Sequence, residues 1–145
     1  LTLYGPVGMA CSRAVLVGVG AGAGKDVRQA LASAVSAVKA ANVKKLVVCF
    51  ATQPQADAIR AAAMAVAEAS YVYTSTKSKP EGRALQRVVL GVPDPSKFRA
   101  VFAQSVAAVK GIELAKEWAN RPANHATPTL LATAARSLAK FTNVK

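Results

Sequence analysis

Residues 13–25 read RAVLVGVGAGAGK, and they set the pattern for the rest of the chain. The apolar, β-branched part of this segment, residues 14–19, predicts a short buried strand. The glycines that follow predict a turn-prone loop. Asp26 lies near the start of a helical pattern, where a carboxylate suits the helix dipole. The apolar residues of this helix, which we expect to end near Asn42, recur on one face: Val27, Leu31, Val35 and Val38.

Strands and helices continue to alternate along the chain. The further predicted elements are a strand at 45–51 (KLVVCFA), an alanine-rich helix at 53–70, a strand at 85–92 (LQRVVLGV), a long helix to about Trp118 and a helix at 129–141. Thr2–Tyr4 is a candidate for one more strand, and Asp94 or Ser96 is the expected N-cap of the long helix. The alternation argues for an α/β domain. Strands without polar alternation predict a mostly parallel or mixed sheet with helices on both faces.

Length and composition bound the class of protein. The 145 residues fit one domain, and 52% apolar residues are enough to build a core. No apolar run reaches the length of a membrane span, so no membrane partner is expected. Cys11 and Cys49 give no disulfide framework, which favours a reducing compartment, and Cys49 lies in an apolar run typical of the core.

The net charge of +12 indicates either a nucleic-acid or acidic partner, or a solvated basic face. The densest basic segment contains the candidate nucleic-acid contacts, which are Lys77, Lys79, Arg83, Arg87, Lys97 and Arg99. Tyr71 and Tyr73 come just before it, and aromatic rings beside cations suit single-stranded nucleic acid. The alternative is a solvated loop and strand edge.

The glycine loop is a candidate phosphate site, because it follows a strand and precedes a helix. Its residues are Gly18, Gly20, Gly22, Gly24 and Lys25. Val19 and Asp26 stand where a P-loop needs glycine and Ser or Thr, and residues 38–50 lack the acid that would hold a ribose. The alternative is a flexible turn between strand and helix.

No catalytic or metal-binding constellation is present in the sequence. One histidine and two distant cysteines cannot build a zinc site, so we expect neither catalytic residues nor a cofactor in this chain. His125 is interpreted as a capping or surface residue. Glu113 and Glu117 share a helix face at i,i+4 near lysines, which is ordinary helix-surface charge.

Residues 111–140 read GIELAKEWANRPANHATPTLLATAARSLAK, and they carry a family resemblance. A helix runs into a connector formed by Asn120, Pro122, Asn124, Thr127 and Pro128, and another helix follows. This segment resembles the one that joins the two domains of the leucyl aminopeptidase (cytosol aminopeptidase) family. Residues 13–20 are similar to the family's strand-and-glycine segment, and the order of elements is similar throughout.

The resemblance implies a macrodomain-like, three-layer amino-terminal domain over residues 1–119, with its first strands missing before Leu1. Residues 120–145 would be the interdomain connector and the start of the next helix. In the family this domain serves hexamer assembly and active-site access. The resemblance implies a cytoplasmic protein; a mitochondrial one is the alternative.

The chemistry of the family belongs to the carboxyl-terminal domain. There two divalent metals, Zn or Mn, are held by Asp, Glu and Lys side chains and activate water for attack on a peptide. The implied function is therefore that of the non-catalytic part of a metallo-aminopeptidase acting on peptides. The alternative is a non-catalytic relative that serves as a nucleic-acid-binding or structural scaffold module.

Overall fold

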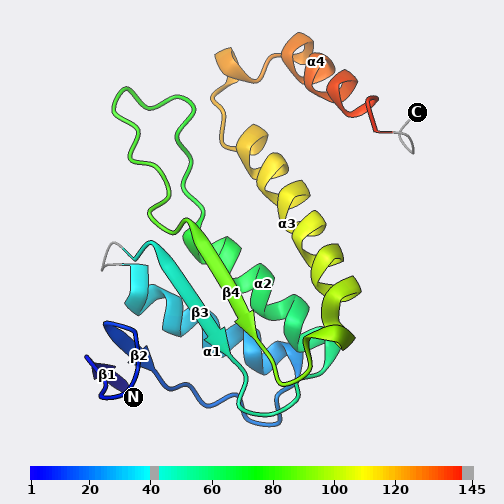
Figure 1. Ribbon diagram of the computed structural model, residues 1–145. Coiled ribbons are helices and arrows are strands. Elements are labelled where there is room, and N and C mark those ends of the chain that lie inside the picture. Colours follow the sequence, from blue (N-terminus) through cyan, green and yellow to red (C-terminus); the bar gives the residue numbers. More distant parts are fainter. Residues whose placement is uncertain (40–42, 142–145) are drawn as a thin grey trace. The chain divides into compact units, whose positions relative to one another are not determined.

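The computed structural model describes residues 1–39 and 43–141, and it confirms the α/β class (Figure 1). Its contacts divide the chain into two compact units. The first unit contains Leu1–Tyr71 and Arg83–Val109, and the second contains Val72–Gly82 and Lys110–Lys145.

Two helices supply the core of the first unit. They are α1 (Gly24–Lys39) and α2 (Ala56–Ser70), and they lie side by side. Val27 of α1 packs with Ala58 and Ala62 of α2, and all three side chains are almost inaccessible to solvent. Small alanines allow the two helix backbones to approach closely. The predicted apolar face of α1 is confirmed at Val27 and Val35, whereas Val38 lies outside the described side chains.

The start of α1 is held against the start of α2 by a side chain. The backbone amide of Gly24 donates a hydrogen bond of 2.8 Å to Oδ2 of Asp57, which lies in the first turn of α2. A Cβ on Gly24 would stand 2.9 Å from that oxygen and 3.0 Å from the Asp57 carbonyl oxygen. Only glycine fits at this contact without displacing backbone.

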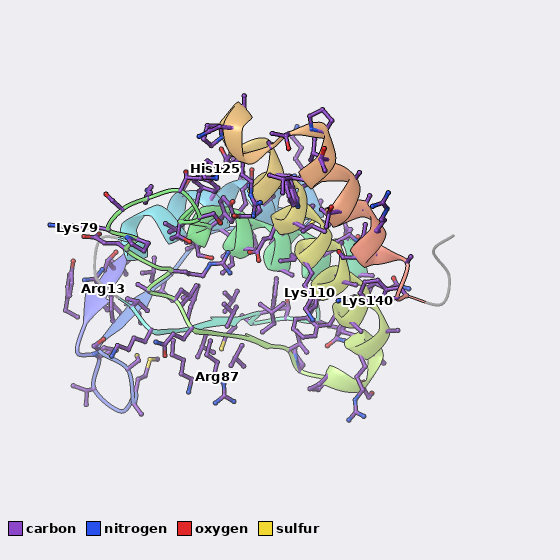
Figure 2. All side chains as sticks on the ribbon, turned by 90° about the horizontal axis from the view of Figure 1, so that it is seen from above. Arg13, Lys79, Arg87, Lys110, His125 and Lys140 are labelled. Carbon is purple, nitrogen blue, oxygen red and sulfur yellow. The ribbon has the colours of Figure 1, made fainter. Side chains whose placement is uncertain are left out.

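Strands β3 (Lys45–Cys49) and β4 (Arg87–Gly91) pair in parallel, with Leu46 opposite Val88. Both strands were predicted. Leu90 packs against the α1–α2 core on one face of the pair, and Figure 2 shows Arg87 on the side away from these helices. On that outer face Val47 and Cys49 are exposed, so the prediction that Cys49 is a core residue is wrong. Among the described residues, α1 and α2 thus cover one face of this parallel pair.

The predicted buried strand at 14–19 differs most from the structure. Only Arg13–Val15 form a strand, β2, which pairs antiparallel with β1 (Thr2–Tyr4) in a separate sheet. The ladder ends where the Leu16 amide donates to the Leu1 carbonyl oxygen at 2.8 Å. Leu16 and Val17 are exposed, because in the described part of the chain no strand lies beside them.

From Pro95 onward, the described chain consists of helices joined by short turns. Asp94 caps a short 3-10 helix (Pro95–Phe98), which leads into α3 (Arg99–Ala119), and a second 3-10 helix (Ala123–His125) precedes α4 (Pro128–Leu138). The periodic apolar residues of α3 are not buried, since Phe102 and Ile112 are 39% and 44% exposed. The predicted last helix ends earlier than expected, since α4 stops at Leu138 and not at residue 141.

We predict that Gly24→Ala destabilises the protein by about 1–3 kcal/mol, because overpacking against fixed backbone exceeds the gain in helix propensity. Urea unfolding followed by circular dichroism measures the loss. Gly18→Ala is the control: a Cβ at this position would have nothing within 4 Å, so its effect should stay within about 0.5 kcal/mol. Equal stability of the Gly24 variant and the wild type would contradict this account of the helix contact.

Candidate functional site

The glycine loop forms a turn that leads into the first residue of α1. Gly20 and Gly22 have φ values of 54° and 74°, in the left-handed region that favours glycine. The Gly22 amide donates to the Val19 carbonyl oxygen at 2.8 Å, which closes the turn. Lys25 is exposed at the start of the helix.

The loop leads to the end of a helix where an anion can be stabilised by free amides and the helix dipole. One of these amides, that of Gly24, already donates to the Asp57 carboxylate. A negatively charged group of the protein itself therefore occupies part of the place that a phosphate would take. Phosphate binding by this loop stays a prediction.

The six predicted basic contacts are divided between the two units. Lys77 and Lys79 belong to the second unit, and the other four belong to the first. Arg83 donates from Nε to the Ser70 carbonyl oxygen at 3.0 Å, and Lys97 lies 3.4 Å from Oδ2 of Asp94. These two contacts are structural ones within the first unit.

Arg87 lies beside a cation that sequence reasoning did not select. The register of the parallel pair places Arg87 opposite Lys45, and the amide of Arg87 donates to the Lys44 carbonyl oxygen. All three side chains are exposed or partly exposed. Lys44 and Lys45 are distant from Arg87 in sequence, so only the pairing of β3 with β4 reveals that these cations gather at one end of the sheet.

The predicted connector has the local structure expected of a helix–turn–helix link. The Asn120 side chain donates to the Lys116 carbonyl oxygen at 2.8 Å, and Oγ1 of Thr127 accepts from the Leu130 amide at 3.4 Å. The helix start at Thr127 and Pro128 is thus confirmed. Pro122 and Asn124 lie at the 3-10 turn and are exposed, and His125 is a surface residue as interpreted.

The carboxyl group of Asp94 has a shifted pKa. Hydrogen bonds from the Ser96 side chain, assisted by the Ser96 amide and by Lys97, hold the pKa of the Asp94 carboxyl below its usual value. A lowered pKa means that this cap favours folding above the carboxyl's unfolded pKa. The contribution is lost as the pH falls through its folded pKa. Asp94 thus acts as a cap, which is a structural role.

The donor set for a metal ion is poor. Over residues 1–39 and 43–141, no three His, Cys, Asp or Glu side chains come together in a way that could hold a metal. Within the same residues, no helix combines the length and the apolar character needed to cross a membrane.

Sequence reasoning missed one side-chain cluster in the second unit. Glu117, interpreted as surface charge, accepts a hydrogen bond from Oγ of Ser75 and lies 3.5 Å from Nη2 of Arg121. Arg121 in turn stacks on Trp118. The spacing of Glu117 and Arg121 at i,i+4 signals their ion pair, but nothing local signals Ser75.

Comparison with known proteins gives one consistent result. A family model described as "Cytosol aminopeptidase family, N-terminal domain" matches residues 1–80. A probable cytosol aminopeptidase of Albidiferax ferrireducens is 65% identical over all 145 residues, which make up 30% of that relative. A probable cytosol aminopeptidase of Acidovorax ebreus is 50% identical over the same length, 29% of the relative.

Two solved structures share the fold. They are the bottromycin maturation enzyme BotP in complex with Mn, with a TM-score of 0.74 and 25% identity, and BotP itself, with a TM-score of 0.72 and 27% identity. Each match covers 97% of this chain and 30% of BotP. The chain spans about 30% of the length of these proteins, and it belongs to the cytosol aminopeptidase family, in which it corresponds to the N-terminal domain.

Proposed function

We propose that this chain is the non-catalytic, amino-terminal part of a dinuclear-metal leucyl aminopeptidase that removes amino-terminal residues from peptides. The observation that carries the proposal is the alignment of all 145 residues with less than a third of relatives named probable cytosol aminopeptidase. A shared segment of that size accounts for a chain that has the fold of the family and, in its described part, no group of side chains that could hold a metal.

The described residues of this chain do not fit a dinuclear metal site, because they include no group of three metal-binding side chains. The two divalent ions of the proposed enzyme, Zn or Mn, would therefore be bound by another domain. The solved structure of one relative, BotP in complex with Mn, supports manganese as one of the candidates. No step of the reaction is assigned to residues of this chain.

Exposed apolar side chains support a role in assembly. On α3, Phe102, Val106 and Ile112 are each more than a third exposed, and they recur at helical spacing. We propose that this stripe packs against further protein, either the catalytic domain or another subunit of a homo-hexamer. A cytoplasmic location is part of the same proposal, and it is supported by the family description.

Residues 120–145 are the proposed interdomain connector and the start of the next helix. The described part of α4 leaves Leu130 and Leu131 exposed, 43% and 44% respectively, while its N-cap at Thr127 is complete. A capped helix with an exposed apolar face is typical of an element that packs on a neighbouring domain. This geometry supports a link between two domains.

We predict that the purified 145-residue chain does not hydrolyse leucyl amides, with or without added Mn²⁺ or Zn²⁺. The reason is that the described residues hold no group of three side chains that could bind a metal ion, and the family's reaction needs two metals to activate water. Release of the amide's leaving group, followed by absorbance, measures the activity, and a known metallo-aminopeptidase is the positive control. Metal-dependent turnover by the chain alone would contradict the proposal that another domain binds the metals and carries out the reaction.

Nucleic-acid binding is the second candidate function, favoured by the net charge of +12 and by the adjacent cations Lys45 and Arg87. On this alternative the chain is a non-catalytic scaffold or binding module. Lysine and arginine side chains that bind phosphates displace counterions from the nucleic acid. The affinity of the protein for nucleic acid therefore falls steeply as the salt concentration rises.

We predict for this alternative that Lys45→Ala and Arg87→Ala each weaken binding to duplex DNA and lower its salt slope by about 1. Fluorescence anisotropy with labelled DNA over a range of salt concentrations measures both effects. Arg28→Ala is the matched control, since Arg28 is paired with Glu68 at 2.8 Å. A flat salt response, or no binding at low salt, would count against the alternative.

A further inference from the structure

A cluster of four side chains joins two segments of the second unit that are far apart in sequence. Ser75 comes from the loop Val72–Gly82, and Glu117, Trp118 and Arg121 come from the end of α3 and the residues just after it. Oγ of Ser75 donates to Oε1 of Glu117, and Nη2 of Arg121 lies 3.5 Å from the same oxygen. The Arg121 guanidinium stacks over the Trp118 ring, 4.0 Å from its centre.

The ion pair in this cluster is better shielded from water than the exposed pair between α1 and α2. The side chains of Arg121 and Glu117 are 25% and 26% exposed, whereas those of Arg28 and Glu68 are 58% and 54% exposed. Screening by solvent weakens an exposed pair more than a partly buried one. The contact between Glu117 and Arg121 is therefore better able to hold a specific geometry.

The stacked guanidinium depends on its planar shape. Its Nε is buried without an acceptor among the described residues, so stacking and the carboxylate hold Arg121 in place, rather than a full set of hydrogen bonds. A planar cation stacks on an indole ring in a way that an ammonium group does not reproduce. Lysine is thus a poor substitute for Arg121.

The loop itself is ordered by short-range bonds. The Lys77 amide donates to the Thr74 carbonyl oxygen at 3.1 Å, and Oγ1 of Thr76 bonds the Tyr73 hydroxyl at 3.1 Å. The contacts of Val72–Gly82 group it with Lys110–Lys145, although the loop is flanked in sequence by α2 and β4 of the first unit. The Ser75 side chain provides a hydrogen bond from this loop to α3.

We propose that Ser75, Glu117, Trp118 and Arg121 form a latch that fastens the loop Val72–Gly82 to the start of the connector. The loop then moves with the connector and opens when the Glu117 contacts are broken. Lys77 and the residues after it are held in a closed loop as long as the latch is formed. The inference concerns contacts within this chain and does not depend on the proposed peptidase function.

If the latch forms, a substitution in the loop should affect α3, and a substitution in α3 should affect the loop. Two probes can test this in the full 145-residue chain. Trp118 is the only tryptophan, so its quenching by acrylamide reports on the α3 side. Tryptic cleavage after Lys77 reports on the loop side, and the bonds after Lys79 and Arg121 precede proline and are resistant. Circular dichroism and the urea midpoint verify that each variant is folded.

Ser75 lies in an exposed loop. We expect Ser75→Ala to raise the acrylamide quenching constant of Trp118 by about twofold, because loss of the Ser75 bond loosens the Arg121–Glu117 pair that holds the guanidinium over the indole ring. Glu117→Gln and Arg121→Lys should each speed cleavage after Lys77 by about tenfold, since native-state cleavage follows the population of the opened segment. Glu68→Gln is the matched control, because it breaks the exposed Arg28–Glu68 pair and leaves every tryptic site intact.

The latch is supported only if both probes respond to changes on the opposite segment and neither responds to Glu68→Gln. Unchanged quenching in Ser75→Ala would overturn it, and so would unchanged cleavage in Glu117→Gln. A response of one probe alone also overturns it, because a latch couples the two segments in both directions.

Discussion

The first unit depends on the contact between the Gly24 amide and the Asp57 carboxylate. This bond joins the first turn of α1 to the first turn of α2, and the missing side chain of Gly24 lets the two backbones approach. Val27, one turn further along α1, then reaches Ala58 and Ala62. Because the helices are rich in alanine, little apolar area is available for burial at each position. Close approach of the backbones is what allows these small side chains to pack together and exclude solvent.

The same contact explains why the glycine loop resembles a nucleotide-binding segment. A glycine-rich turn that leads into a helix has two uses, approach by a phosphate and approach by another part of the protein. In this chain the glycine turn serves the approach of another part of the protein, since the Asp57 carboxylate accepts a hydrogen bond from the Gly24 amide. Sequence alone could not separate the two uses, because Asp57 is 33 residues away from Gly24.

The parts of the fold that follow from local pattern were predictable. The strands at 45–49 and 87–91, the helices, the cap at Asp94 and the helix start at Thr127 each rest on residues close in sequence. The family resemblance also rests on a local segment, and comparison with known proteins confirms it. The strand at 14–19 and the exposure of Cys49 were not predictable, because they depend on which strand lies alongside. Leu16 and Val17 have strand-forming sequence but no neighbouring strand in the described residues, so pattern alone gave too long an element.

Glu117 shows the same limit for function. Its spacing from Glu113 suggests ordinary helix charge, and its ion pair with Arg121 fits a local rule. Its bond with Ser75, however, crosses 42 residues of sequence. Lys45 and Arg87 are a similar case, because strand pairing alone places these like charges together. In both cases the residues most suited to a role beyond folding are those whose partners lie elsewhere in the chain. The role of a charged side chain on a helix or strand is therefore best inferred from the distant residue that the fold places beside it. For Glu117 that residue is Ser75 of a loop, and for Arg87 it is the cation Lys45.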